Sequence, residues 1–219
     1  MTSLVNLLTC KPVNPTMIKM TSIDNAYYPY VQANLQRFFP VNEEQSRFLM
    51  PYLQVRQFDK KTIILNEGEV EQYLSMVVKG LVRKYVIKSK KETTLQLATE
   101  GHLIDSEISY LRREPSKVII ETIEPSFLVS LSNDSMQEVL EKMPGANRMG
   151  RLLQTAMLIK KDERQYKQLA LSTRERFLEY LQNHPHMLQR VPQKYLASYL
   201  NIKPETFSRL KHLIRQQTV

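Results

Sequence analysis

The 219-residue chain has one cysteine, Cys10, and no tryptophan. A single cysteine excludes an intramolecular disulfide and an all-cysteine metal or iron–sulfur cluster, and it fits a reducing cytoplasm. The five glycines form no glycine-rich phosphate loop. No run approaches the roughly 18 apolar residues that cross a membrane. His184 and His186 have no cysteine partners for zinc, and no nucleophile–base set is present. These absences predict a cytoplasmic protein with no membrane span, metal site or enzymatic activity.

Acidic residues are also scarce, and the resulting positive charge is uneven. The chain has 31 Lys and Arg against 22 Asp and Glu, a net charge of +9 with a pI near 9.5. Residues 171–219 contain eight of the basic residues and three of the acidic ones, so they carry +5 in 49 residues. A basic C-terminal domain indicates a polyanionic partner.

Short β segments fill the chain from about residue 55 to residue 131. Turn signals separate them about every ten residues, which is typical of an antiparallel β-barrel or jelly roll. A helix is expected over 41–53 with Asn42 as N-cap, and another to Lys142 with Asn133 or Asp134 as N-cap. The predicted strands are Thr62–Leu65, Tyr73–Val78, Leu81–Ile87, Thr93–Ala98, Val118–Ile123 and Phe127–Leu131.

Pro144-Gly145 ends that helix, and a longer helical pattern runs from Ala146 to about Leu171. Its apolar stripe is wider than one amphipathic face needs, and Glu163 interrupts it. Two interpretations fit, a helix packed on its own barrel or a dimer coiled coil that also touches the barrel. The candidate dimer residues are Met149, Leu152, Leu153, Ala156, Met157 and Ile159.

Residues 191–213, VPQKYLASYLNIKPETFSRLKHL, are the most informative stretch. They predict two short helices, with Pro192 and Pro204 at their first positions and Asn201 in the left-handed conformation between them. Phe207 and Leu210 would face the first helix. Polar and basic residues then remain near the start of the second helix, as the major groove requires. The alternative is a surface helical hairpin with a solvated basic face.

The order of barrel, long helix and helix-turn-helix resembles the Crp/Fnr family of bacterial transcription regulators. The resemblance covers about residues 35–213 through ILNEGE (64–69), VVKGLVRKY (77–85), EGHLID (100–105), RERFLEYL (174–181) and the C-terminal helical pair. The chain most resembles the members of this family that are found in Bacteroidetes-type bacteria. The resemblance implies an α+β fold, with a cyclic-nucleotide-binding-like barrel, a dimerisation helix and a winged helix-turn-helix. The expected boundaries are a loose extension over 1–24, the sensor over 25–145, the dimerisation helix over 146–170 and the DNA-binding domain over 171–219.

In this family a Glu and an Arg on the recognition helix read base edges within the pattern Glu-Thr-x-(Ser/Gly)-Arg. That pattern is Glu205-Thr206-Phe207-Ser208-Arg209 here. A further Arg that precedes the Glu in some members is Pro204 in this chain, and Asn201 replaces the usual Gly. The residues that the resemblance and the basic pattern assign to DNA are Gln193, Lys203, Glu205, Thr206, Ser208, Arg209 and Lys211.

The sensor half departs from the members that bind cyclic AMP. Their Gly-Glu for the ribose aligns with Asp105-Ser106, and their Arg-Ser/Thr for the phosphate aligns with Ser116-Lys117. Lys117 offers a point charge but no bidentate fork, and an unpaired buried phosphate costs several kcal/mol. We therefore expect no resident cofactor and no response to cyclic AMP, with these four residues marking the pocket of an unidentified small-molecule effector.

The sequence predicts a homodimeric, sequence-specific regulator that binds double-stranded DNA, with RNA polymerase as a further candidate partner. A ligand-binding signalling protein, whose helix-turn-helix is a protein contact surface, remains the alternative. A jelly-roll enzyme would need metal ligands that the strands do not offer.

Overall fold

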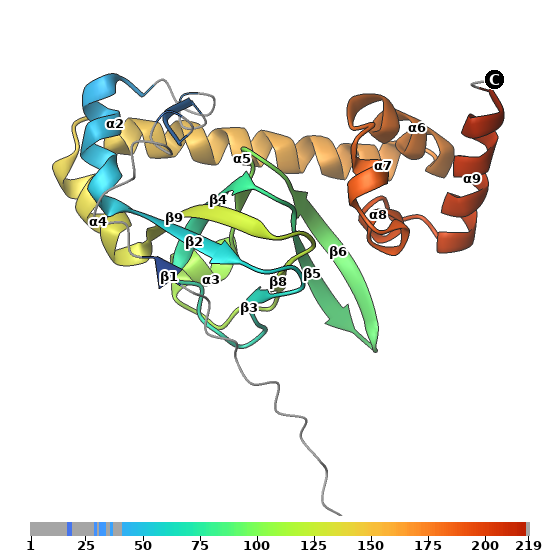
Figure 1. The fold of residues 1–219 in the computed structure, drawn as a ribbon, viewed down its shortest axis with the longest axis horizontal. Coiled ribbons are helices and arrows are strands. Elements are labelled where there is room, and N and C mark those ends of the chain that lie inside the picture. The colour runs from blue at the N-terminus through green and yellow to red at the C-terminus, as the bar shows by residue number, and fades with distance from the viewer. Residues whose placement is uncertain (1–16, 19–28, 30, 34–35, 37–40, 218–219) are drawn as a thin grey trace, which may run out of the picture.

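The computed structural model describes residues 17–18, 29, 31–33, 36 and 41–217 of the chain (Figure 1). The expected loose extension over 1–24 lies outside these residues except for β1, Met17–Ile18, which pairs with β2. Cys10 is also outside the described part.

Two antiparallel sheets form the barrel, and the predicted jelly roll is confirmed. One has the order β1-β2-β9-β4-β7 and the other the order β3-β8-β5-β6. Alternate side chains of both sheets meet in a buried core around Val77, Val82, Ile120 and Leu128. The strands are β2 Leu53–Phe58, β3 Ile63–Leu65, β4 Tyr73–Lys79, β5 Val82–Lys88, β6 Lys91–Ala98, β7 Leu103–Ile104, β8 Ile119–Thr122 and β9 Ser126–Ser132.

Both expected helices beside the barrel form, but their limits differ from the prediction. Helix α2, Glu43–Leu49, begins at the predicted N-cap Asn42, and a 3-10 turn, Met50–Tyr52, follows it. Strand β2 then starts at Leu53, inside the predicted helix, because Pro51 favours ending the helix. Helix α4, Asn133–Lys142, has Ser132 as its N-cap, since the Ser132 hydroxyl accepts from the Ser135 amide. The prediction of Asn133 or Asp134 is therefore wrong by one or two residues.

Helix α5, Ala146–Ala170, confirms the long helix and explains its wide stripe. Met149 and Leu153 pack on the α2–α4 cluster of the sensor domain. Leu152 and Ile159 face elsewhere and are 45% and 53% exposed. The stripe therefore consists of two apolar faces, one packed on the α2–α4 cluster and one exposed, as far as the described residues show.

Beyond α5 the chain forms a helical module at the other end of this long helix (Figure 1). It comprises α6 Thr173–Asn183, α7 Met187–Arg190, α8 Gln193–Tyr199 and α9 Pro204–Gln217. The expected wing is absent from residues 171–217, which contain no strand. Only nine residues, including Pro185 and Pro192, connect α6 to α8. Four of these nine residues form α7, so too few remain for the two strands of a hairpin.

Candidate functional site

Helices α8 and α9 follow one another across a short connection, as predicted for the two short helices of this stretch. Asn201 has φ 54°, so the expected left-handed turn residue is confirmed. The Ile202 amide donates to the Ala197 carbonyl and closes the turn. Pro192 is the N-cap of α8 rather than its first helical residue, whereas Pro204 does begin α9. The prolines and the asparagine thus fix both helix starts and the angle between them.

The face of α9 that points away from the module carries the residues assigned to DNA. Phe207 is buried and meets the Phe177 ring edge-on at 5.0 Å between centroids. Burial of Phe207 turns the neighbouring positions outward, so Glu205 and Arg209 are exposed one helical turn apart. Lys203 and Gln193 are also exposed, while Thr206, Ser208 and Lys211 are half-buried at the edges of this face.

A residue that the sequence did not single out holds the turn in place. The Arg176 guanidinium, on α6, donates to the Leu200 carbonyl at 3.2 Å and to the Asn201 carbonyl at 3.4 Å. It also donates to the Leu171 carbonyl at 2.6 Å, where α5 ends. One side chain therefore connects the long helix to the turn. In the sequence, the only signal for Arg176 was its position in a basic segment.

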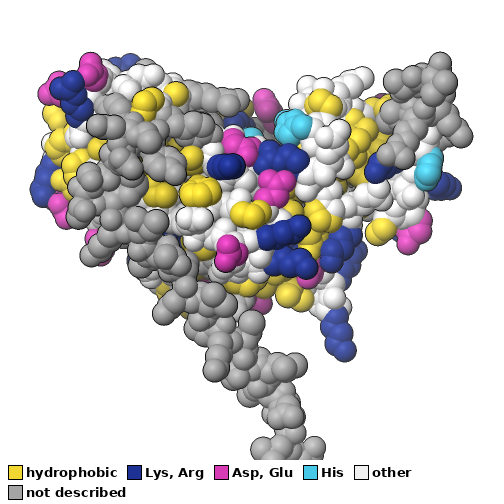
Figure 2. Space-filling model, in the orientation of Figure 1, with side chains coloured by type: hydrophobic (Ala, Val, Ile, Leu, Met, Phe, Trp, Pro, Cys, Tyr) yellow, Lys and Arg dark blue, Asp and Glu magenta, His cyan; other side chains and the backbone are white. Residues whose placement is uncertain are grey.

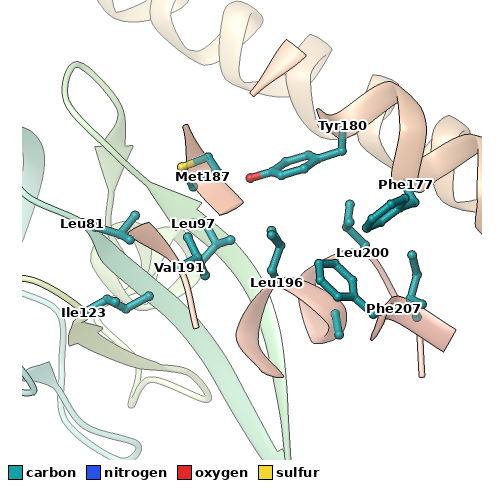
Figure 3. Close-up of a cluster of buried hydrophobic side chains, with 12 residues drawn as sticks. Leu81, Leu97, Ile123, Phe177, Tyr180, Met187, Val191, Leu196, Leu200 and Phe207 are labelled. Atoms are coloured by element: carbon teal, nitrogen blue, oxygen red, sulfur yellow. The ribbon is translucent and has the colours of Figure 1, made fainter. Parts of the chain in front are cut away.

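The helical module is packed directly on the barrel. Leu81, Leu97 and Ile123 of the barrel share one buried cluster with Met187, Val191, Leu196 and Phe207 (Figure 3). Figure 3 shows the Val191 side chain lying between the barrel leucines and the helices. The module and barrel therefore share a core.

Two arginines reinforce this junction. Arg190 donates to Glu100 at 2.8 Å, to Glu124 at 2.7 Å and to the Gly80 carbonyl at 3.0 Å. The carboxylates raise the pKa of Arg190, and its hydrogen bonds bring the pKa of Glu100 to about 2 against the effect of burial. Arg83 lies 3.8 Å from the ring centroids of both Tyr85 and Tyr195. Every partner except Tyr195 belongs to the barrel, so these cations join the two parts.

Of the four residues predicted for an effector pocket, Ser106, Ser116 and Lys117 line one cavity, whereas Asp105 does not. Asp105 is buried at 4% exposure, and Lys117 is exposed. The hydroxyl of Ser116 donates to that of Ser106 at 3.0 Å, so these two residues satisfy each other. The positions that the alignment assigned to ribose and phosphate are thus joined by a hydrogen bond between the two serine side chains.

Beside this serine pair lies a charged network that includes the first residue of helix α3, Glu107–Arg112. Lys84 on β5 donates to Glu107 at 2.9 Å, and Lys161 on α5 reaches the same carboxylate at 2.9 Å. Although burial opposes it, the two lysines lower the pKa of Glu107. Burial, with Glu107 adding repulsion, raises the pKa of Asp105 to about 7. The sequence missed both α3 and this link between barrel and long helix.

A cavity of about 1020 Å³ opens beside Ser106, Ser116 and Lys117. Leu153, Ala156 and Met157 of α5 form one wall, and the far end reaches α6–α8. Tyr180, His184 and Tyr199 line that end. A molecule in this space would touch the barrel, the long helix and the helical module together.

Neither a metal cluster nor a membrane span is found in the described part of the chain. The His, Cys, Asp and Glu side chains there form no group of three or more that could hold a metal ion. None of the helices in that part is long and apolar enough to cross a bilayer.

Comparisons with known proteins agree with the architecture. Residues 55–143 match the family model of the cyclic nucleotide-binding domain. No curated protein matches the chain. FixK2 of Bradyrhizobium japonicum is similar in structure with a TM-score of 0.63 and 18% identity, over 76% of this chain and 86% of that one.

Two further solved structures share the fold. The c-di-GMP responsive global regulator CLP of Xanthomonas campestris has a TM-score of 0.59 and 17% identity, over 78% of this chain and 90% of that one. The Thermus thermophilus catabolite activator protein has a TM-score of 0.50 and 21% identity, over 85% and 88%. The chain therefore combines a cyclic nucleotide-binding fold with C-terminal helices, an architecture that it shares with Crp/Fnr-type regulators.

Proposed function

We propose that this protein is a dimeric, sequence-specific DNA-binding transcription regulator of the Crp/Fnr type. The observation that carries the proposal is the exposed pair Glu205 and Arg209, one turn apart at the start of a helix whose other face is buried. A carboxylate accepts from cytosine N4, and a guanidinium binds guanine O6 and N7 bidentately. Both groups stand where a recognition helix presents base-reading side chains.

A dimer supplies the second recognition helix. Two such helices read half-sites separated by one DNA turn, about 34 Å. The exposed seam of α5 through Leu152, Ala156 and Ile159 offers the contact surface. RNA polymerase stays a candidate partner on the analogy with the regulator family.

Cyclic AMP is not the proposed effector. The phosphate of a cyclic nucleotide needs a cationic fork, and Ser116 is neutral and already bonded to Ser106. Lys117 at the mouth of the cavity supplies a single point charge. The cavity is better suited to an effector that does not require those two groups.

The test begins by selecting duplexes that the wild-type protein binds from a random-sequence pool. Arg209→Ala should then cost about 1–3 kcal/mol on the selected duplex and relax the preference at one G·C pair. Lys211 is proposed to contact a phosphate, so Lys211→Ala should lower the affinity for selected and scrambled duplexes equally. Adding millimolar cyclic AMP should leave the wild-type affinity unchanged.

Two results would overturn this assignment. The first result is that Arg209→Ala lowers the affinity for selected and scrambled DNA equally, which would mean that α9 does not read bases. The second result is that no duplex is selected and that the contacts between protomers depend only weakly on salt. This result would favour the alternative, a ligand-binding signalling protein whose helical pair binds another protein.

A further inference from the structure

The β5–β6 hairpin ends in an unpaired basic tip. Lys88, Ser89, Lys90 and Lys91 are all exposed. Among the described residues, no carboxylate forms an ion pair with these three lysines. Figure 2 shows dark blue Lys and Arg side chains over the lower end of the hairpin. The tip is therefore a concentrated positive surface with no partner in the described part of its own chain.

The backbone of the tip is unusual for the residues that it holds. Lys88 pairs with Lys91, so Ser89 and Lys90 form a two-residue loop, and their φ angles are 50° and 64°. Positive φ at both positions is the requirement of a type I′ turn, which favours Asn-Gly or Asp-Gly. A lysine at the second position is strained where glycine would relax the chain. The strain, together with the charge, singles this tip out as a candidate functional element.

The hairpin is also fixed to the first helix of the helix-turn-helix. The Thr94 amide donates to the Ser198 hydroxyl at 2.9 Å, and that hydroxyl donates to the Glu92 carbonyl at 3.4 Å. Arg83 on β5 stacks on Tyr195 of α8 while it pairs with Glu92. In Figure 1 the tip extends past α8 toward the side of the view on which α9 begins. Because the hairpin base and α8 share these contacts, the tip has a fixed position beside the helical pair.

We propose that the hairpin tip is an accessory DNA-backbone contact, so that the sensor barrel itself binds phosphates beside the half-site read by α9. This inference rests on the proposed function. The first helix of a helix-turn-helix crosses the DNA backbone, and Lys88, Lys90 and Lys91 extend the positive surface of Lys194 and Lys203 beyond that helix. Lys88, Lys90, Lys91, Lys194 and Lys203 are each exposed, and lysines recognise phosphate as point charges without reading bases. The contact therefore adds affinity and leaves the sequence preference unchanged.

The experiment measures the salt dependence of DNA affinity on a random-sequence duplex of 40 base pairs, a length of our choosing. Each lost phosphate contact lowers the slope of log K against log salt by about 0.9. Lys90→Gln/Lys91→Gln should therefore reduce the slope by about 1.8 per protomer. The matched control is Arg47→Gln/Lys142→Gln, which removes the same charge from exposed residues on α2 and α4, at the far end of the long helix (Figure 1).

A second variant separates a binding role from a folding role. Lys90→Gly removes the charge and relieves the positive-φ strain, so its melting temperature should rise while its DNA affinity falls. A purely structural hairpin would give a more stable protein with unchanged affinity, which contradicts the proposal.

The outcomes distinguish this inference from the function on which it rests. If both double variants have the same slope while Arg209→Ala still relaxes base preference, the hairpin proposal is wrong and the regulator proposal stands. The same conclusion follows if the hairpin variants lose an acidic protein partner and keep full DNA affinity. If the wild type binds no duplex, both proposals are wrong.

Discussion

The carboxyl group of Asp105 is buried in the barrel and forms no ion pair with a described residue. Lys84 donates to the Asp105 backbone carbonyl at 3.0 Å and gives its charge to Glu107 instead. Burial raises the pKa of Asp105 to about 7. The native protein therefore binds a proton here between about pH 4 and pH 7, where the unfolded chain has released it. The contribution of this group to stability falls as pH rises through that window.

Asp105→Asn should remove this dependence. The difference in unfolding free energy between variant and wild type should be small at pH 4 and should favour the variant at pH 8 by up to about 4 kcal/mol. Urea unfolding at a series of pH values measures it. Asp59→Asn, which makes the same substitution at an exposed turn after β2, is the control. A difference that does not change with pH would mean that Asp105 is charged in the native state.

At the scale of single elements, local sequence signals predicted most of the fold. Strands β3, β4, β6, β8 and β9 lie within two residues of the predicted limits, since turn residues bound them. The first four residues of strand β5 are all buried, whereas an antiparallel strand with one face in solvent alternates buried and exposed residues. The register of β5 shifts at a bulge between Lys84 and Tyr85. The barrel core lies on one side of this part of the strand, and the helical module packs on the barrel from the other side. No local pattern reports such coverage.

The functional elements show the same limit. The helical pair α8–α9 was predictable because two prolines and an asparagine mark its boundaries within 13 residues. The contacts of Arg190 were not, because Glu124 and Glu100 are 66 and 90 positions away in the sequence. Pairing over that distance depends on the tertiary fold. The cavity, which combines three segments of the chain, was hidden for the same reason.

The junction between barrel and module should depend on the fork of Arg190. Arg190→Ala leaves the half-buried carboxylates Glu100 and Glu124 without a cation and should lower the unfolding free energy by about 2 kcal/mol. Arg190→Lys keeps the charge but cannot bridge both acids, so its loss should be intermediate. Guanidinium unfolding measures both variants, and chymotrypsin should cut the α6–α8 connection, which contains Leu188, faster in the alanine variant. Equal stability of all three proteins would show that the apolar cluster alone holds the junction.

At the scale of the whole molecule, the exposed face of α5 is the interface of the proposed dimer. Its seam follows alternating steps of three and four residues through Leu152, Ala156, Ile159, Glu163 and Tyr166. All five are exposed, and this spacing is that of a coiled-coil interface. Glu163 is the one charged position in the seam, where a polar residue costs stability and specifies register. On the inner face, Leu153 packs on the α2–α4 cluster, and Leu153 and Met157 line the cavity.

Leu152→Glu/Ala156→Glu should therefore separate the dimer, because two pairs of like charges would face each other across the seam. Sedimentation at micromolar concentration should show a dimer for the wild type and a monomer for the variant. Gln154→Glu, exposed on the same helix but outside the seam, should remain dimeric. A monomer carries half of the phosphate contacts, so the salt dependence of its DNA affinity should fall to about half of the wild-type slope. A stable wild-type monomer would rule out the seam as an interface. It would also leave each recognition helix to bind its half-site alone.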